Sequence, residues 1–366
     1  MRSKKILLWG WFGEENIGDD LLLNTFLAKI ANDSCEITVP MATKYAFAQS
    51  NIHEIQRTYT ALFYEAIKND TLIIGPGGLF PFDDIPKLIV FLNAICIWKL
   101  LNRKVIFFGI GISEKMSRFS TFLWRQIIRK SDLFLKRSPD LLEKIGVRES
   151  KTVHTISDTA FASNIKFRKG EKSKCALVSV ANIYSDKNSS AFHDSVNVWS
   201  YIVQRIIAEG YNVDLVAFTK GLDDELIVAI KENLTLLENH IHIINYTTLQ
   251  NSLDSWGEYS FSVCMRFHAL VLSILADVPP FPLAYGHKTY SLAKLSGLEE
   301  YTMIWNCFQK QYYGVNIEFS IDKFNQKFEQ FLSNQNNIRT ALVQEREKHV
   351  ESALQSFYEL ENSLDK

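Results

Sequence analysis

Short apolar runs recur along the first half of the chain, and stretches with helical spacing separate many of them. The runs lie at residues 5–9, 37–40, 71–74, 104–108 and 133–135, and the helical stretches at 19–27, 88–101 and 119–130. Apolar runs of three to five residues suit buried strands, whereas the longer stretches suit helices. Strands that alternate with helices predict a parallel sheet in a doubly wound domain.

The same alternation restarts after residues 166–174, a charged segment with little to bury, which predicts an interdomain linker. Beyond it, strands are expected at 176–180, 213–218, 242–245, 259–265 and 279–285, with helices at 195–208, 223–231, 269–275 and 289–295. We therefore predict an α/β protein with two Rossmann-like domains facing a cleft, residues 1–168 and 175–320. Residues 321–366 have helical apolar spacing and are expected to form C-terminal helices packing back on the body.

Composition narrows the classes of function. Forty basic and 41 acidic residues leave a formal net charge of −1, so no overall basic field recruits nucleic acid. Five widely spaced cysteines, without a CxxC pair, argue against a disulfide framework or structural zinc and for a reducing cytoplasm. The longest apolar run, 88–101, is shorter than the roughly 20 residues that span a bilayer, so no transmembrane segment is expected.

Glycine-rich loops follow several predicted strands. The first, Gly13 to Asp20, opens a helix whose first turn holds Asp19 and Asp20; the others contain Gly75 to Gly78, and Gly109 with Gly111. Glycine leaves room for a ligand near the backbone, and a helix N-terminus can hold an anion or a sugar hydroxyl. None of these loops is a GxGxxG fingerprint or a phosphate-binding P-loop.

Cationic residues interrupt apolar sequence at two strand-to-helix junctions. Arg266 and His268 are expected in a turn between strand and helix, and Arg137 follows an earlier strand, before Ser138 as N-cap and Pro139 in the first helical turn. Such junctions bind anions in open α/β sheets. The alternative is that Arg266 pairs with a local carboxylate and His268 is a core histidine.

A metal site is weakly indicated. Glu238, His240 and His242 alternate along the chain without a further ligand nearby in sequence, and no GxSxG nucleophile elbow is present. We therefore expect neither a metal nor a bound cofactor.

Several short motifs together resemble the polysaccharide pyruvyl transferase family. In chain order they are Asn16 to Leu21, Gly75 to Gly78, Gly109 to Gly111, Arg137, Asp158, Arg266 to Ala269 and Tyr285 to Lys288. The resemblance implies a fold similar to the GT-B glycosyltransferases. It also implies transfer of a pyruvyl group from phosphoenolpyruvate, the co-substrate, to a sugar as a cyclic ketal in surface or capsular polysaccharide biosynthesis.

This chemistry assigns candidate roles to the matched residues. Arg266 would bind the phosphate or carboxylate with Arg137 or Lys288 assisting, and His268 would be the general acid. Asp19, Asp20 and Asp158 are candidate bases. The remaining candidate substrate contacts are Asn16, Gly18, Gly77, Gly78, Tyr285 and His287.

Two other functions stay open on the sequence: a GT-B glycosyltransferase that uses a nucleotide sugar, and a non-catalytic sugar-phosphate binding protein. The expected partners are phosphoenolpyruvate and a glycan acceptor, in the cytoplasm. A lipid-linked acceptor would bring the protein to the inner face of the membrane, with residues 88–101 or Trp98 at the bilayer surface. The sequence leaves the acceptor sugar and the oligomeric state open.

Overall fold

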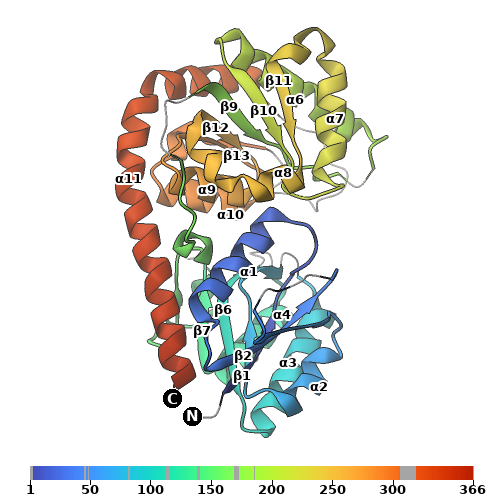
Figure 1. Ribbon diagram of the computed structural model, residues 1–366, viewed down its shortest axis with the longest axis vertical. Coiled ribbons are helices and arrows are strands. Elements are labelled where there is room, and N and C mark those ends of the chain that lie inside the picture. The colour runs from blue at the N-terminus through green and yellow to red at the C-terminus, as the bar shows by residue number, and fades with distance from the viewer. Residues whose placement is uncertain are drawn as a thin grey trace. The chain divides into compact units, whose positions relative to one another are not determined.

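The computed structural model describes residues 3–44, 47, 49–80, 83–112, 116–137, 141–168, 173–184, 186–305 and 319–365. Ser138, Pro139 and Cys307 lie outside these ranges, as does part of the expected linker. The chain forms two compact units (Figure 1). Unit 1 comprises residues 1–14, 19–164 and 349–366, and unit 2 comprises residues 15–18 and 165–348.

Unit 1 is built on a parallel sheet of eight strands. They are β1 (Lys4–Trp9), β2 (Cys35–Met41), β3 (Ile52–Gln56), β4 (Thr71–Ile74), β5 (Gly77–Phe80), β6 (Lys104–Ile112), β7 (Leu133–Lys136) and β8 (Val153–Thr155). The order is β3-β2-β1-β4-β6-β7-β8, with β5 beside β6. The direction of winding reverses between β1 and β4, and such a switch point is where doubly wound sheets bind ligands.

Helices cover both faces of this sheet (Figure 1). They are α1 (Ile17–Ile30), α2 (Ala61–Lys68), α3 (Ile85–Leu100), α4 (Arg118–Lys130) and the short α5 (Leu141–Ile145). One core joins α2, α3, α4 and α5 to β1, β4 and β6, with Phe91, Trp98 and Trp124 almost fully buried in it. On α1, Phe26 packs against Phe108 of β6.

Unit 2 holds a parallel sheet of six strands. They are β9 (Ser173–Ser179), β10 (Asn212–Val216), β11 (Ile241–Ile244), β12 (Tyr259–Cys264), β13 (Pro280–Ala284) and β14 (Met303–Ile304), in the order β11-β10-β9-β12-β13-β14. Its helices are α6 (Ser190–Ala208), α7 (Asp223–Asn233), α8 (Tyr246–Asn251), α9 (Phe267–Leu275) and α10 (His287–Leu295). The switch point lies between β9 and β12.

The C-terminal stretch is one helix, α11 (Ile321–Asp365), and not several. Its residues up to 348 belong to unit 2 and those from 349 to unit 1. In unit 2, Phe328 and Phe331 pack edge-on against Phe261 and Phe281 of β12 and β13. Among the apolar residues of this helix, Leu354 is 43% exposed, whereas the following are buried: Phe324, Phe328, Phe331, Leu342 and Phe357.

The sequence predicted the main strands and helices to within a few residues, but three details differ. Gly109 and Gly111 lie inside β6, because β5 pairs with β6 beyond the end of β4 and extends the ladder. Strands β3, β5 and β14 and helices α2 and α8 were not predicted. The helix after β12 begins at Phe267, two residues earlier than expected.

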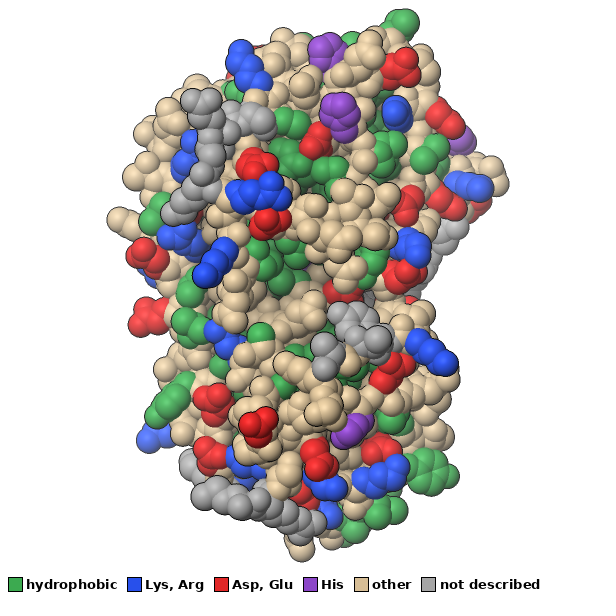
Figure 2. All heavy atoms as spheres, viewed as in Figure 1, with side chains coloured by type: hydrophobic (Ala, Val, Ile, Leu, Met, Phe, Trp, Pro, Cys, Tyr) green, Lys and Arg blue, Asp and Glu red, His purple; other side chains and the backbone are tan. Residues whose placement is uncertain are grey.

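Acidic and basic side chains are interspersed on the face shown in Figure 2, in keeping with a net charge near zero. Within the described residues, no helix is long and apolar enough to cross a membrane. The proposed bilayer contact through Trp98 is wrong, because its side chain is fully buried and its Nε1 donates to the Leu62 carbonyl at 2.7 Å. The four described cysteines are free thiols.

Candidate active site

Arg266 and His268 lie at the switch point of the second sheet. Strand β12 ends at Cys264, Arg266 is the N-cap of α9, and His268 is in the first turn of that helix. The expected turn is therefore reduced to Met265 and Arg266. Both side chains lie at the carboxyl edge of the sheet, beside a helix N-terminus that the Arg266 side chain does not cap.

The Arg266 guanidinium is held by Asp223, the first residue of α7. Nε of Arg266 donates to Asp223 Oδ2 at 3.0 Å, and Nη2 donates to Oδ1. The fully buried carboxylate also accepts backbone N–H groups of Asn182, Phe218 and Thr219 at 3.0 to 3.1 Å. Burial lowers the pKa of Arg266, but Asp223 and Tyr285 outweigh it and raise that pKa above its ordinary value. Arg266 is thus a fixed, permanently charged group. Its pairing with a carboxylate agrees with one of the two alternatives that the sequence suggested for this residue.

His268 packs against the backbone of Gly18. A Cβ atom at position 18 would lie 1.9 Å from Nδ1 of His268 and 2.6 Å from its Cγ, so only glycine fits. The segment before Gly18 is tied to unit 2: Ile17 N donates to the Phe218 carbonyl at 2.9 Å, and Asn16 Nδ2 donates to Thr219 Oγ1 at 2.8 Å. Asn16 Oδ1 also accepts the Gly18 N–H at 2.9 Å. The Asn16 to Gly18 motif therefore forms the surface against which the His268 ring packs.

A second helix N-terminus stands beside the first. Strand β13, which pairs with β12, leads through buried Tyr285 to α10, whose first residues are His287 and Lys288. Nδ1 of His287 lies 2.9 Å from Ser291 Oγ. The Lys288 Nζ lies 5.8 Å from the centre of the Phe267 ring, which also packs edge-on against His268. Unit 2 thus brings together the candidates Asn16, Gly18, Arg266, His268, Tyr285, His287 and Lys288.

Unit 1 gathers the other candidates at its own carboxyl edge. Arg137 follows β7 and donates through Nη1 to Asp158 Oδ2 at 2.5 Å, with side chains only 5% and 2% exposed. Its guanidinium lies against Gly78 and Gly111, where a Cβ would come within 3.2 and 2.9 Å of it. Asp158 Oδ1 accepts the Ala160 N–H at 2.9 Å. Both oxygens of Asp158 are therefore occupied.

Asp19 and Gly77 also lie near each other in unit 1. Oδ1 of Asp19 would be 3.6 Å from a Cβ at Gly77, a residue with φ of 130°. Asp20, the next residue on α1, is buried. Asp19 is thus the more accessible of the two carboxylates.

The residue that the sequence did not single out is Asp223. Its position in the first turn of a predicted helix was the only signal, and that signal is common to many helices. In the part of the chain that the structure describes, no three His, Cys, Asp or Glu residues are placed to hold a metal ion. The weak Glu238, His240 and His242 grouping forms no such cluster, and His240 Nδ1 lies 3.0 Å from Asn212 Oδ1.

Comparison with solved structures defines the class of fold. The chain resembles the Anabaena protein HepE in complex with UDP-glucose, at 15% identity and a TM-score of 0.60, over 98% of this chain and 99% of that one. It also resembles a Siraitia grosvenorii ugt transferase in complex with UDP, at 10% identity and a TM-score of 0.59 over the whole of both chains. The UDP-GlcNAc 2-epimerase of Neisseria meningitidis aligns at 8% identity and a TM-score of 0.56, over 98% of this chain and all of that one. The protein therefore has a GT-B-like fold, as predicted.

The family is given by the sequence itself. The family model described as polysaccharide pyruvyl transferase matches residues 16–287, so the chain belongs to this family. The matched range begins at Asn16 and ends at His287, and so includes both carboxyl-edge clusters except for Lys288. Comparison with curated proteins gives no match.

Proposed function

We propose that the protein transfers a pyruvyl group from phosphoenolpyruvate to two hydroxyls of a sugar, forming a cyclic ketal in polysaccharide biosynthesis. The observation that carries the proposal is the cluster at the second switch point. There, in a member of this family, Arg266, His268, His287 and Lys288 surround two adjacent helix N-termini.

Phosphoenolpyruvate needs such a site because it carries a phosphate and a carboxylate. The charges of Arg266 and Asp223 nearly cancel, so the pair contributes little net positive charge to the site. Its contribution is a guanidinium edge whose N–H donors are fixed in orientation. Net attraction for the anion then comes from the N-termini of α9 and α10 and from Lys288, whose side chain is exposed. We assign Lys288 to anion capture and Arg266 to orientation of the bound anion.

The transfer begins with a proton delivered to the methylene carbon of phosphoenolpyruvate, for which His268 is the proposed acid. A sugar hydroxyl then bonds to C2, the C2–O bond to phosphate breaks, and a second hydroxyl closes the ketal. One hydroxyl proton restores the acid and the other leaves with inorganic phosphate. Packing against Gly18 would hold the imidazole in place during this cycle, because an acid must stay within hydrogen-bond reach of the carbon.

The base is proposed to be Asp19. Asp158 is less suited, because Arg137 and the Ala160 N–H occupy its oxygens, and Asp20 is buried. Asp158 is instead proposed to hold Arg137 against Gly78 and Gly111.

The test is phosphate release from phosphoenolpyruvate with a panel of glycan acceptors, together with a mass gain on the acceptor. His268→Ala should lower kcat at least about a hundredfold. Its matched control is His193→Ala, an exposed histidine on α6 of the same unit. Lys288→Met should raise KM for phosphoenolpyruvate, whereas Lys294→Met, near the end of α10, should not.

Two results would overturn the proposal. One is turnover of a nucleotide sugar without consumption of phosphoenolpyruvate, which would make the protein a glycosyltransferase. The other is saturable binding of phosphoenolpyruvate without phosphate release on any acceptor of the panel.

A further inference from the structure

A pocket of about 240 Å³ opens at the carboxyl edge of the first sheet, wholly within unit 1. Its walls come from the end of β1, the segment after β3, strand β5 and helix α3. The lining residues are Trp9, Trp11, Arg57, Thr58, Tyr59, Leu79, Lys87 and Phe91. The pocket adjoins the switch point between β1 and β4, because the Gly75 N–H bonds to the Trp9 carbonyl at 2.8 Å and Leu79 follows Gly77 and Gly78.

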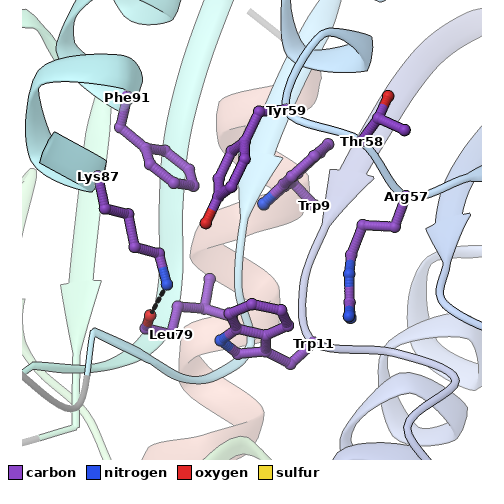
Figure 3. Close-up of a pocket in the computed structure, with 8 residues that line it drawn as sticks. All are labelled: Trp9, Trp11, Arg57, Thr58, Tyr59, Leu79, Lys87 and Phe91. Atoms are coloured by element: carbon purple, nitrogen blue, oxygen red, sulfur yellow. Dashed lines mark hydrogen bonds between the residues drawn. The ribbon is translucent and has the colours of Figure 1, made fainter. Parts of the chain in front are cut away.

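Four aromatic rings form most of the wall. The rings of Trp9 and Tyr59 stack at a centroid distance of 6.1 Å, and Phe91 meets both edge-on at 6.3 Å. Tyr59 is 43% exposed although its ring belongs to this stack. Figure 3 shows Tyr59 between Phe91 and Trp9, with its hydroxyl directed to the side on which Lys87 lies. An open aromatic face of this kind matches the apolar C–H face of a pyranose ring.

Two cations flank the same rings. Arg57 and Lys87 lie over the Trp11 ring at 4.2 and 4.6 Å from its centroid, one on each side in Figure 3. Lys87 Nζ donates to the Leu79 carbonyl at 2.6 Å and has further hydrogens to offer. Burial, with Arg57 nearby and in spite of Asp84, lowers the pKa of Lys87 to about 8. The fold thus keeps a partly desolvated ammonium group beside a guanidinium. An anion bound between them would reduce the repulsion between these two positive charges.

Carboxylates near the pocket do not cancel these charges. Glu14 pairs with Arg57, but the Glu14 side chain is 49% exposed, whereas that of Arg57 is 11% exposed. Asp84 is exposed, and one of its oxygens accepts the Lys87 backbone N–H at 3.0 Å as the N-cap of α3. A ligand anion would therefore compete mainly with Glu14, a solvated group that is easily displaced.

We propose that this pocket binds a pyranose that carries an anionic group, with the ring against Tyr59 and the anion between Arg57 and Lys87. The role of this ligand rests on the function proposed above. Under that function, the ligand is the sugar acceptor or its neighbour in the growing glycan. The anion is a phosphate in a phosphate-linked sugar or a carboxylate in a uronic acid.

The test is titration calorimetry on the full chain without phosphoenolpyruvate, using glucose 1-phosphate, glucuronic acid, glucose and inorganic phosphate as probes. At least one charged sugar should bind ten times more tightly than glucose and than inorganic phosphate. Preference for glucose 1-phosphate identifies a phosphate-linked sugar, and preference for glucuronic acid identifies a uronic acid. Equal binding of glucose, or no binding of either charged sugar, overturns the proposal.

Matched variants locate the binding. Tyr59→Ala should weaken the charged sugar at least tenfold, whereas Tyr64→Ala, on the exposed side of α2, should leave it unchanged. Lys87→Met should remove the preference for the charged sugar, whereas Lys68→Met, an exposed lysine of α2, should not. Glu14→Gln should tighten binding, because it removes the competing carboxylate from Arg57. Unchanged affinity in Lys87→Met with a native melting curve would refute the assignment.

Affinity for glucuronic acid should also fall as pH rises through 8, because Lys87 loses its proton there. The other charged groups beside Lys87 are Arg57, Glu14 and Asp84. Burial raises the pKa of the Tyr59 hydroxyl above its ordinary value, so this group does not lose its proton near pH 8. The binding assay does not involve His268 or phosphoenolpyruvate. Failure of the pocket therefore leaves the pyruvyl transfer proposal standing, and failure of phosphate release leaves sugar binding measurable.

Discussion

Replacing Gly18 by alanine would test whether the loop before α1 positions the proposed acid. The new Cβ would lie 1.9 Å from Nδ1 of His268, against the 3.4 Å at which ordinary contact begins, so the ring or the loop must shift by about 1.5 Å. Misplacement of a catalytic group by about 1 Å typically costs about a hundredfold in rate. We therefore expect Gly18→Ala to lower kcat for phosphate release about a hundredfold.

The effect on stability should be no larger than the effect on rate, because a hundredfold loss of kcat corresponds to about 2.7 kcal/mol. Overpacking at a buried site costs about 1–3 kcal/mol. Alanine is favoured over glycine within a helix by roughly 0.5–1 kcal/mol, and Gly18 is the second residue of α1. The net loss is thus at most about 2.5 kcal/mol, which urea unfolding would measure.

The double variant Gly18→Ala/His268→Ala separates a positioning effect from a general one. Removing the imidazole removes the clash, so the double variant should match His268→Ala in kcat and exceed it in unfolding free energy by roughly 0.5–1 kcal/mol, the helix preference of alanine over glycine. The reasoning is refuted if Gly18→Ala retains kcat within threefold of the parent protein. It is also refuted if the alanine lowers kcat further in the His268→Ala background.

Three other predictions follow from buried groups. Asp223→Asn should lower the free energy of unfolding by about 3–5 kcal/mol in urea titrations, because it leaves the Arg266 charge without its carboxylate; a loss under 1 kcal/mol would contradict this ion pair. Lys87 binds its proton less tightly in the folded than in the unfolded chain, so folding stability rises with pH between about 8 and 10.5. The melting temperature of the unsubstituted protein should therefore rise relative to that of Lys87→Met from pH 7.5 to 10. A constant difference in melting temperature would contradict the lowered pKa of Lys87. Burial raises the pKa of Cys264 to about 11, so native protein at pH 8 should resist iodoacetamide at this thiol while urea-unfolded protein reacts, as peptide mass mapping would show.

Local pattern was sufficient to predict the two sheets, because their central strands are short apolar runs buried on both faces. It missed β3, whose sequence Ile52–Gln56 is mostly exposed, as suits the edge of a sheet. The aromatic pocket was missed for the same reason, because Arg57 and Tyr59 follow this unpredicted strand.

The candidate site was predictable as a set of residue types but not as a set of contacts. The pattern of strand and helix placed Arg266 and His268 at a strand-to-helix junction, where the structure has them, whereas it did not indicate that Lys288 would lie at the end of the neighbouring strand. The bond from Arg266 to Asp223 joins residues 43 apart, and the packing of His268 on Gly18 joins residues from opposite halves of the chain. Such pairings depend on strand order, which periodicity along one chain does not encode.

The membership of residues 15–18 in unit 2 has a consequence for protein engineering. A chimera made by joining the first 164 residues of one family member to the remainder of another would pair the His268 ring with a foreign loop. An isolated fragment from Ile165 onward would leave Nδ1 of the same ring without its glycine neighbour. Exchange of unit 2 between family members should therefore include residues 15–18, grafted separately from the C-terminal segment.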